Sequence, residues 1–413
     1  MSSSARIQVF LLGLTACPVE TPKPDAGSVS VLDAGMLRDA SSSSDAAGTH
    51  DAGSTDQLII NSQDHQVIDS YLEGQIERLN LVGLAAAIVD GNEIRYFKAW
   101  GYADREQDIA ADPQQTIWRL ASLSKGVTGV IATRLAQRRV INLESPLPNL
   151  EPEFVAPTRY LPPNCETISC TRPLADDAPP LTLDLLLHHR GGIVHYNNGL
   201  GNPSPPQEQA DDPQFNTGMR WSISFLAGQP LIAQPGARFA YTSFGYNLAG
   251  AALEVLADTS FDELLRQEVA EPAGAPSLQV ERLWQPVPNL AAVYKRWGNT
   301  MQRDDRSDVS WKAAGGGLVA TIEDMARYCH ALIQRKLTRQ DRDTNLWSPA
   351  PDDTYAHGFI RNQESGTIEH NGAQQGARSG LLIQPERERC FLVMTNSEAG
   401  NGTTWVRAMA ERW

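Results

Sequence analysis

Strand-like segments lie at both ends of the folded part of this 413-residue chain, and helical patterns fill the stretch between them. Two of these segments flank "DGN" at residues 90–92, a strong hairpin signal. The predicted strands are 81–89, 93–103, 355–361, 366–372, 379–385 and 390–396, and helices are predicted before and after them at 60–79 and 403–413. This order predicts an α+β fold. One antiparallel sheet is flanked by the N- and C-terminal helices, and a mainly helical subdomain is inserted over about 140–310.

The first 57 residues differ in composition from the rest of the chain. Residues 1–17 combine Arg6, a short apolar stretch and the sequence LTAC, which resembles a bacterial lipoprotein signal that ends at a lipidated Cys17. An ordinary signal peptide or a start-site artefact is the alternative. Residues 18–57 repeat Asp-Ala-Gly units among Ser and Pro with almost nothing to bury, which predicts a flexible tether. We therefore expect an exported protein, anchored by lipid to a membrane of the bacterial cell envelope, with its folded domain over 58–413.

Charge and cysteine content narrow the function class. The formal net charge of −14 argues against a nucleic-acid partner, whose phosphates would be repelled. The sequence contains no run of 18 apolar residues, so no transmembrane helix is predicted. Cys165 and Cys170 lie in a Pro-rich loop, where an oxidising compartment favours a short-loop disulfide. A metal clip is the competing interpretation, but it lacks a second ligand pair nearby. Cys329, in a helical pattern, and Cys390, in a strand pattern, are expected to be buried thiols.

The sequence SLSK places a lysine, Lys125, one helical turn after Ser122, at the start of an apolar segment. A buried ammonium group is costly unless it is paired or has lost its proton. If Ser122 opens a helix, the two side chains share one face, and the free N–H groups of the helix start can stabilise an oxyanion. S-x-x-K alone is a weak motif, but this position predicts proton transfer between Lys125 and Ser122.

Four further segments make a family resemblance specific. They are "LLLHHRGGIVHY" (185–196), "PGARFAYTSFGYNLAG" (235–250), "AAGGGLVATIEDMARY" (313–328) and "IEHNGAQQGARSGLLIQP" (368–385). Together with SLSK, they resemble the motifs of the serine β-lactamase and penicillin-binding protein superfamily, class C-like branch, in the same order and with similar spacing. The resemblance covers about residues 60–413 and implies the β-lactamase/transpeptidase-like fold.

The resemblance also implies roles for individual residues. Ser122 corresponds to the acylated nucleophile and Lys125 to its proton partner. Tyr241 would act as general base and then as acid, either as a phenolate or through a relay with Lys125. The oxyanion hole would be the N–H groups of Ser122 and Ala373. Substrate contacts are expected from Ser243, His370 and Gly372, and the reaction needs no metal or cofactor.

Two departures from the family pattern bear on the substrate. Ser243 replaces the family asparagine, so it lacks an amide that both donates and accepts. His370 replaces the lysine that meets a β-lactam carboxylate, and it is mostly neutral at pH 7. We therefore expect a serine hydrolase that acts on a peptide or small-molecule ester rather than an efficient β-lactamase. The alternatives are a true β-lactamase or D-alanyl-D-alanine carboxypeptidase, and a non-catalytic surface binding protein with a vestigial site.

Two other patterns are assigned structural roles. His188, His189 and His195 have no nearby carboxylate or cysteine to complete a metal site, so none is predicted, and His189 is expected to shape the turn before the next two glycines. The glycine run 315–317 lacks the Lys-Ser/Thr of a phosphate loop and is expected to let two backbones approach closely.

Overall fold

The computed structural model describes residues 62–165, 167–196, 205–339 and 346–413. The predicted signal segment 1–17 with Cys17, and the tether 18–57, lie outside these residues and remain predictions. Among the helices of the described ranges, none has the length and apolar character needed to span a membrane.

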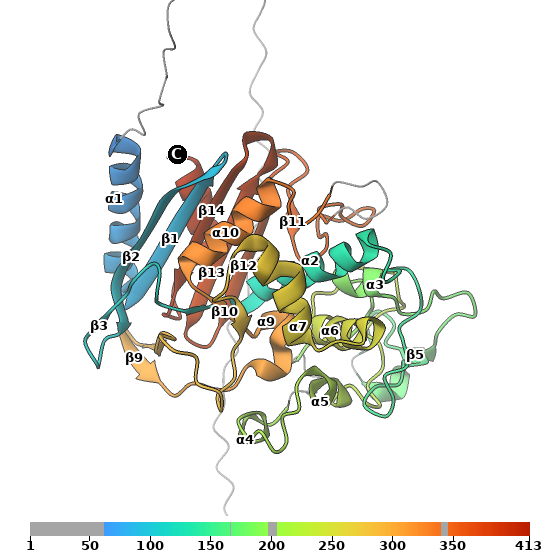
Figure 1. Cartoon of the computed structure of the whole chain (residues 1–413). Helices are drawn as coiled ribbons and strands as arrows, with labels where there is room; N and C mark the ends of the chain where they lie inside the picture. Colours follow the sequence, from blue (N-terminus) through green and yellow to red (C-terminus); the bar gives the residue numbers. More distant parts are fainter. Residues whose placement is uncertain (1–61, 166, 197–204, 340–345) are drawn as a thin grey trace, which may run out of the picture. The chain divides into compact units, whose positions relative to one another are not determined.

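The described residues form one seven-stranded sheet that contains strands from both ends of the chain (Figure 1). Its order is β11-β12-β13-β14-β1-β2-β3, and each neighbouring pair is antiparallel. The strands are β1 (Gly83–Asp90), β2 (Glu93–Asp104), β3 (Ile109–Ala110), β11 (Ile360–Arg361), β12 (Ile368–Gln374), β13 (Ala377–Gln384) and β14 (Arg389–Thr395). The predicted hairpin joins β1 to β2. The predicted α+β arrangement is confirmed, although only the last two residues of predicted strand 355–361 pair in the sheet.

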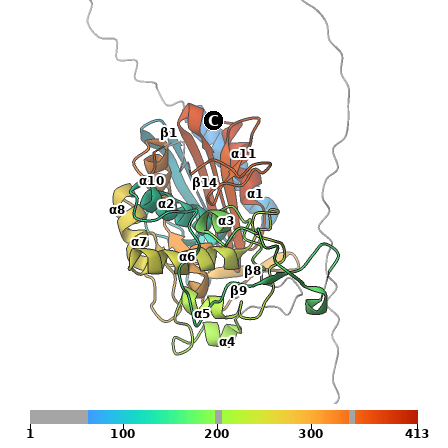
Figure 2. The ribbon, with the colours of Figure 1, turned by 90° about the vertical axis from the view of Figure 1, so that its right-hand side faces the viewer.

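Helices cover both faces of the sheet. Helices α1 (Ser62–Leu79) and α11 (Gly402–Ala410) lie on one face, and α10 (Ile322–Ile333) lies on the other (Figure 2). Successive side chains of a strand point to opposite faces, so β1 supplies both cores. Leu84, Ala86 and Ile88 pack with α1 and α11, whereas the alternate residues join the larger core that contains α10. Residue Thr321 caps α10 by accepting a hydrogen bond from the Asp324 N–H at 3.1 Å.

The inserted region is less purely helical than predicted. Its helices are α3 (Leu183–Leu187), α4 (Gln207–Ala210), α5 (Met219–Ser224), α6 (Ser243–Ala257), α7 (Phe261–Leu265) and α8 (Glu271–Ala273). Within the same region, β8 (Val293–Trp297) and β9 (Thr300–Asp304) form a hairpin that the sequence analysis missed. Both strands are short and rich in charged residues, so their sequence lacks the apolar alternation that marks a strand.

Two disulfides are present among the described residues. The short-loop pair Cys165–Cys170 agrees with the favoured interpretation. Cys329 and Cys390 were expected to be free thiols, and this expectation is wrong, because they are bonded to each other and join α10 to β14. Their local patterns identified a helix and a strand but not the packing of one on the other. Closing a loop with a sequence separation of 61 residues stabilises the fold by roughly 4 kcal/mol in the chain-entropy model.

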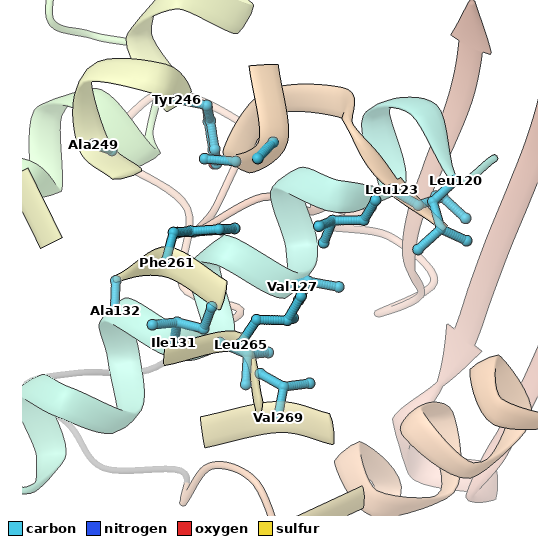
Figure 3. Close-up of a cluster of buried hydrophobic side chains, with 14 of the residues drawn as sticks. Leu120, Leu123, Val127, Ile131, Ala132, Tyr246, Ala249, Phe261, Leu265 and Val269 are labelled. Carbon is cyan, nitrogen blue, oxygen red and sulfur yellow. The ribbon is translucent and has the colours of Figure 1, made fainter. Parts of the chain in front are cut away.

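Helix α2 (Ser124–Gln137) is held in the core beside the site. Its side chains Val127 and Ile131 are fully buried and pack near Phe261 and Leu265 of α7, with Val269 close by (Figure 3). Fully burying one such aliphatic side chain stabilises the fold by about 1.5–3 kcal/mol. The packing therefore fixes the helix that carries Lys125 and gives that lysine little freedom to move toward solvent.

Candidate active site

Ser122 lies in a 3₁₀ turn, η1 (Ala121–Leu123), that leads directly into α2. Ala121 has φ 49°, a left-handed conformation that is uncommon for a residue with a side chain. The turn is tied to two strands. The Leu120 N–H donates to the Leu318 carbonyl at 2.9 Å, and the Leu120 carbonyl accepts from the Ser379 hydroxyl at 2.7 Å. The predicted placement of Ser122 at the start of a helix is therefore correct, with the α-helix itself beginning two residues later.

The Lys125 side chain is fully buried, and its Nζ lies beside Ser122. Nζ is 3.1 Å from Ser122 Oγ and 3.0 Å from Ser243 Oγ, and it also donates to the Gly315 carbonyl. No carboxylate pairs with it among the described residues. Burial lowers the pKa of Lys125 to about 7, because desolvation disfavours the charged form.

This arrangement suits a neutral amine. A neutral amine has two N–H donors and one lone pair. The Ser243 hydroxyl oxygen and the Gly315 carbonyl oxygen accept hydrogen bonds from the two N–H groups. The lone pair of the Lys125 nitrogen therefore points toward the hydroxyl of Ser122. Lys125 can therefore accept the proton of Ser122 directly.

Tyr241 approaches the same hydroxyl from the inserted region. Its Oη lies 2.9 Å from Ser122 Oγ, and its ring centroid is 4.9 Å from Lys125 Nζ. Burial raises the pKa of Tyr241 to about 12, although the hydrogen bond to Ser122 opposes the shift. The phenol therefore keeps its proton at neutral pH. Of the two roles that the resemblance allowed, the relay with Lys125 fits this geometry and the resting phenolate does not.

Two histidines that precede the Tyr241 segment in sequence hold it in place. His189 is buried at φ 56°, its Nδ1 accepts the Thr242 N–H at 3.1 Å, and its ring lies 4.3 Å from that of Tyr241. The expected structural role of His189 is confirmed. The sequence analysis missed the matching role of His195, whose Nδ1 accepts the Ser243 N–H at 3.2 Å. Burial lowers the pKa of both rings, which keeps them neutral acceptors.

Ser243 and the glycine run meet at Lys125. Ser243 lies in the first turn of α6 and is 3% exposed, and its hydroxyl oxygen accepts a hydrogen bond from Lys125 Nζ. A Cβ on Gly315 would lie 2.9 Å from the Ser243 carbonyl, which confirms the predicted close approach of two backbones. The contact of the Gly315 carbonyl with Lys125 was not predicted, because a backbone acceptor leaves no mark in the side-chain pattern.

His370 does not occupy the position expected of a substrate-binding residue. It is 3% exposed, its Nε2 lies 3.0 Å from the Tyr355 hydroxyl, and its Nδ1 lies 2.6 Å from the Asn371 carbonyl. Burial and the nearby charge of Lys125 lower the pKa of His370 to about 3. Both ring nitrogens have hydrogen-bond partners, so His370 packs with Tyr355 behind the Tyr241 ring and presents no charge to a substrate carboxylate.

Gly372 brings β12 against the nucleophile turn. A Cβ at this position would lie 2.4 Å from the Leu120 carbonyl and 3.0 Å from Ala121 Cβ, so a larger residue would push the strand away. Gly372 therefore allows β12 to pack closely against the turn that carries Ser122, and it does not make the direct substrate contact that was expected. Ala373 follows and is exposed, beside the turn that carries Ser122. The two N–H groups of the oxyanion hole remain a prediction that this proximity supports.

Lys312 is a second cation near the site that the sequence analysis missed. Its Nζ lies 5.8 Å from the Tyr196 ring and 5.4 Å from the Trp311 ring, and its charge contributes to the low pKa of His195. Burial lowers the pKa of Lys312 to about 8, so it stays mostly protonated at pH 7. Neither a hydrogen bond nor an ion pair engages this ammonium group among the described residues. No signal other than the residue type could have identified it.

The fold and these motifs match known proteins. A family model described as Beta-lactamase matches residues 68–412. The chain is 24% identical over 399 residues to the serine β-lactamase-like protein LACTB, mitochondrial, of Mus musculus, covering 72% of this chain and 68% of the relative. It spans 64% of the length of Protein flp of Staphylococcus aureus, at 21% identity over 82% of its own length.

Solved structures share the fold at low sequence identity. A penicillin-binding protein from Bacillus halodurans aligns with TM-score 0.65 at 20% identity, over 83% of this chain and 98% of that one. The D-amino acid amidase from Ochrobactrum anthropi aligns with TM-score 0.63 at 19% identity, over 85% and 96% of the two chains. With a family model that covers most of its length and a serine, lysine and tyrosine joined at the motif positions, the chain belongs to the β-lactamase family.

Proposed function

We propose that this protein is a serine hydrolase that forms an acyl-enzyme on Ser122. The observation that carries the proposal is the convergence of Lys125 Nζ at 3.1 Å and Tyr241 Oη at 2.9 Å on one hydroxyl oxygen. Nucleophile and base within hydrogen-bond reach, with the base itself oriented by further groups, are the signature of an activated nucleophile.

The reaction follows from the protonation states. Neutral Lys125 takes the proton of Ser122 as Oγ attacks the substrate carbonyl, and the N–H groups of Ser122 and Ala373 stabilise the oxyanion. Tyr241 then donates its proton to the leaving group as the carbonyl–leaving-group bond breaks, and the Lys125 ammonium returns a proton to Tyr241. A water molecule, deprotonated by the same unit, releases the acid and restores Ser122.

The proposed substrate class rests on the charges near Ser122. We propose an ester or peptide amide whose acyl part bears a carboxylate, because Lys312 places an ammonium group beside His195 and Tyr196 and forms no ion pair with the residues that the structure describes. A hydrogen bond to a charged group contributes about 1.5–3 kcal/mol. A penicillin is expected to react slowly, because the position where the family lysine meets its carboxylate is taken by the buried, neutral His370.

A substrate panel tests this proposal. We expect kcat/KM to be higher for a carboxylate-bearing ester and amide than for their neutral analogues, with slow acylation by a penicillin. In Lys312→Met the carboxylate preference should fall by about 10-fold, equivalent to about 1.4 kcal/mol. Lys295→Met, a change to an exposed lysine of β8, is the matched control and should leave the preference intact.

The contrary outcomes separate the alternatives. Penicillin turnover as fast as that of the esters would identify a true β-lactamase. An equal loss for charged and neutral substrates in Lys312→Met would show that Lys312 does not recognise the carboxylate. No turnover of any substrate, with a folded protein, would favour the binding-protein alternative.

A further inference from the structure

A second cluster of polar side chains lies outside the serine centre. Asp184 and His188 come from α3 and its C-terminal end, and His357 comes from the segment that leads into β11. Asp184 Oδ1 lies 3.3 Å from His188 Nδ1 and 3.3 Å from His357 Nε2, and one ligand atom from each residue lies within 4.8 Å of the others. Both histidines are buried, at 6% and 3% exposure.

These distances suit a shared cation better than direct hydrogen bonds. Charge-assisted N–H···O bonds cluster at about 2.7–2.9 Å. Tetrahedral zinc with bonds of about 2.0–2.1 Å places neighbouring ligand atoms about 3.3–3.4 Å apart, the edge of the tetrahedron. Two of the three edges in the cluster have this length.

Each histidine also has a partner for its other ring nitrogen. His188 Nε2 lies 3.2 Å from the Ser348 carbonyl, and His357 Nδ1 lies 3.0 Å from Thr133 Oγ1. If each of these nitrogens donates its N–H outward, the remaining lone pairs of both rings face the Asp184 carboxylate. Metal-bound histidines in proteins show this pattern, in which an outer acceptor fixes the tautomer and the ring orientation.

The cluster opens onto a cleft. The cleft has a volume of about 1010 Å³ and is lined by the three residues together with Asn142, Glu144 and Ser348. A metal ion bound by three protein ligands therefore has an entry path and room for a water molecule in its fourth position.

We propose that Asp184, His188 and His357 form a binding site for a divalent transition metal, with Zn²⁺ the ion that fits best. Imidazole and carboxylate ligands in tetrahedral order suit zinc. The metal would clamp α3 to the 346–359 segment, which also supplies Tyr355 to the wall behind Tyr241. The site is structural and does not depend on the proposed hydrolase activity.

A proton is the competing occupant of the same position. Burial alone would lower the pKa of His188, but its hydrogen bond and charge interaction with Asp184 outweigh burial and raise it. In the metal-free protein, His188 Nδ1 donates to the Asp184 main-chain carbonyl at 2.9 Å. Metal binding would release the proton from His188 Nδ1. The Asp184 main-chain carbonyl would still accept a hydrogen bond from the His188 main-chain N–H, at 3.1 Å.

Zinc binding to the untagged full-length protein tests the proposal. Titration with zinc chloride, followed by dialysis and elemental analysis, should give one tightly held Zn²⁺ per chain. Asp184→Asn and His188→Gln should each weaken binding by at least about 100-fold, and Thr133→Val by about 10- to 100-fold through loss of the outer partner. His330→Gln, on α10 and outside the cluster, is the control and should bind like wild type.

Cobalt gives a readout that needs no variant. Wild type loaded with Co²⁺ should show the intense visible absorption of tetrahedral cobalt, and equimolar Zn²⁺ should abolish it. The proposal is overturned if wild type holds no stoichiometric zinc, or if folded Asp184→Asn and His188→Gln bind as tightly as wild type. An octahedral cobalt spectrum would also overturn it.

Discussion

Replacing Lys125 by methionine is expected to lower kcat/KM for an ester roughly 10²- to 10⁴-fold, the usual contribution of a general base. Methionine keeps the length of the buried side chain and removes only the amine. Because burial lowers the pKa of Lys125 to about 7, the wild-type rate should fall as the pH drops through about 7, where the amine becomes protonated.

The pH profile separates a base from a structural support. In Lys125→Met the residual rate should lose the limb near pH 7, while the protein should remain folded. The substitution ends the desolvation cost of the amine, and this gain offsets the loss of the donor to the Gly315 carbonyl. If the limb near pH 7 persists in the variant, another group carries the titration and Lys125 is not the base.

Tyr241→Phe, alone and combined with Lys125→Met, is expected to show that the two side chains act as one unit. Both contact Ser122 Oγ, and the Tyr241 ring lies beside Lys125 Nζ. When two residues act as one unit, removing either abolishes the contribution of both to the rate, and removing the second costs little more. Each single variant and the double variant should therefore have rates that are similar within about 10-fold.

The alternative outcome of this double-mutant cycle is equally clear. If the two losses multiply in the double variant, the residues act independently, and the relay in which Lys125 returns a proton to Tyr241 is incorrect. Tyr328→Phe provides a control, because this buried tyrosine belongs to α10 and lies outside the Ser122 hydrogen bonds. It should retain the pH limb of wild type.

The sequence predicted the parts of this site that depend on local geometry. S-x-x-K places Ser122 and Lys125 one turn apart, and the structure joins them as expected. The order of strands and helices likewise predicted a sheet built from both ends of the chain.

The parts that were missed depend on contacts between distant segments. His370 sits on the inward face of β12, and which residues of a strand point inward depends on a register that no turn signal defined here. The bond between Cys329 and Cys390 requires knowing that α10 packs on β14. His357 meets Asp184 from 173 residues away, so its part in the cluster could not be read from the sequence. The statement that the histidine group lacks a nearby carboxylate is wrong for a different reason, because Asp184 lies four residues before His188 and the two side chains meet on one face of a helix.

Covalent labelling of Ser122 tests the central claim most directly. Wild type treated with a fluorophosphonate should gain the mass of one adduct, mapped to Ser122, and Ser122→Ala should gain none. Ser124→Ala is the matched control, since this nearby hydroxyl donates to the Ala121 carbonyl at 2.7 Å and is fully buried, and it should still be labelled. Labelling of Ser122→Ala to the same extent as wild type, or an adduct mapped to another residue, would contradict the account.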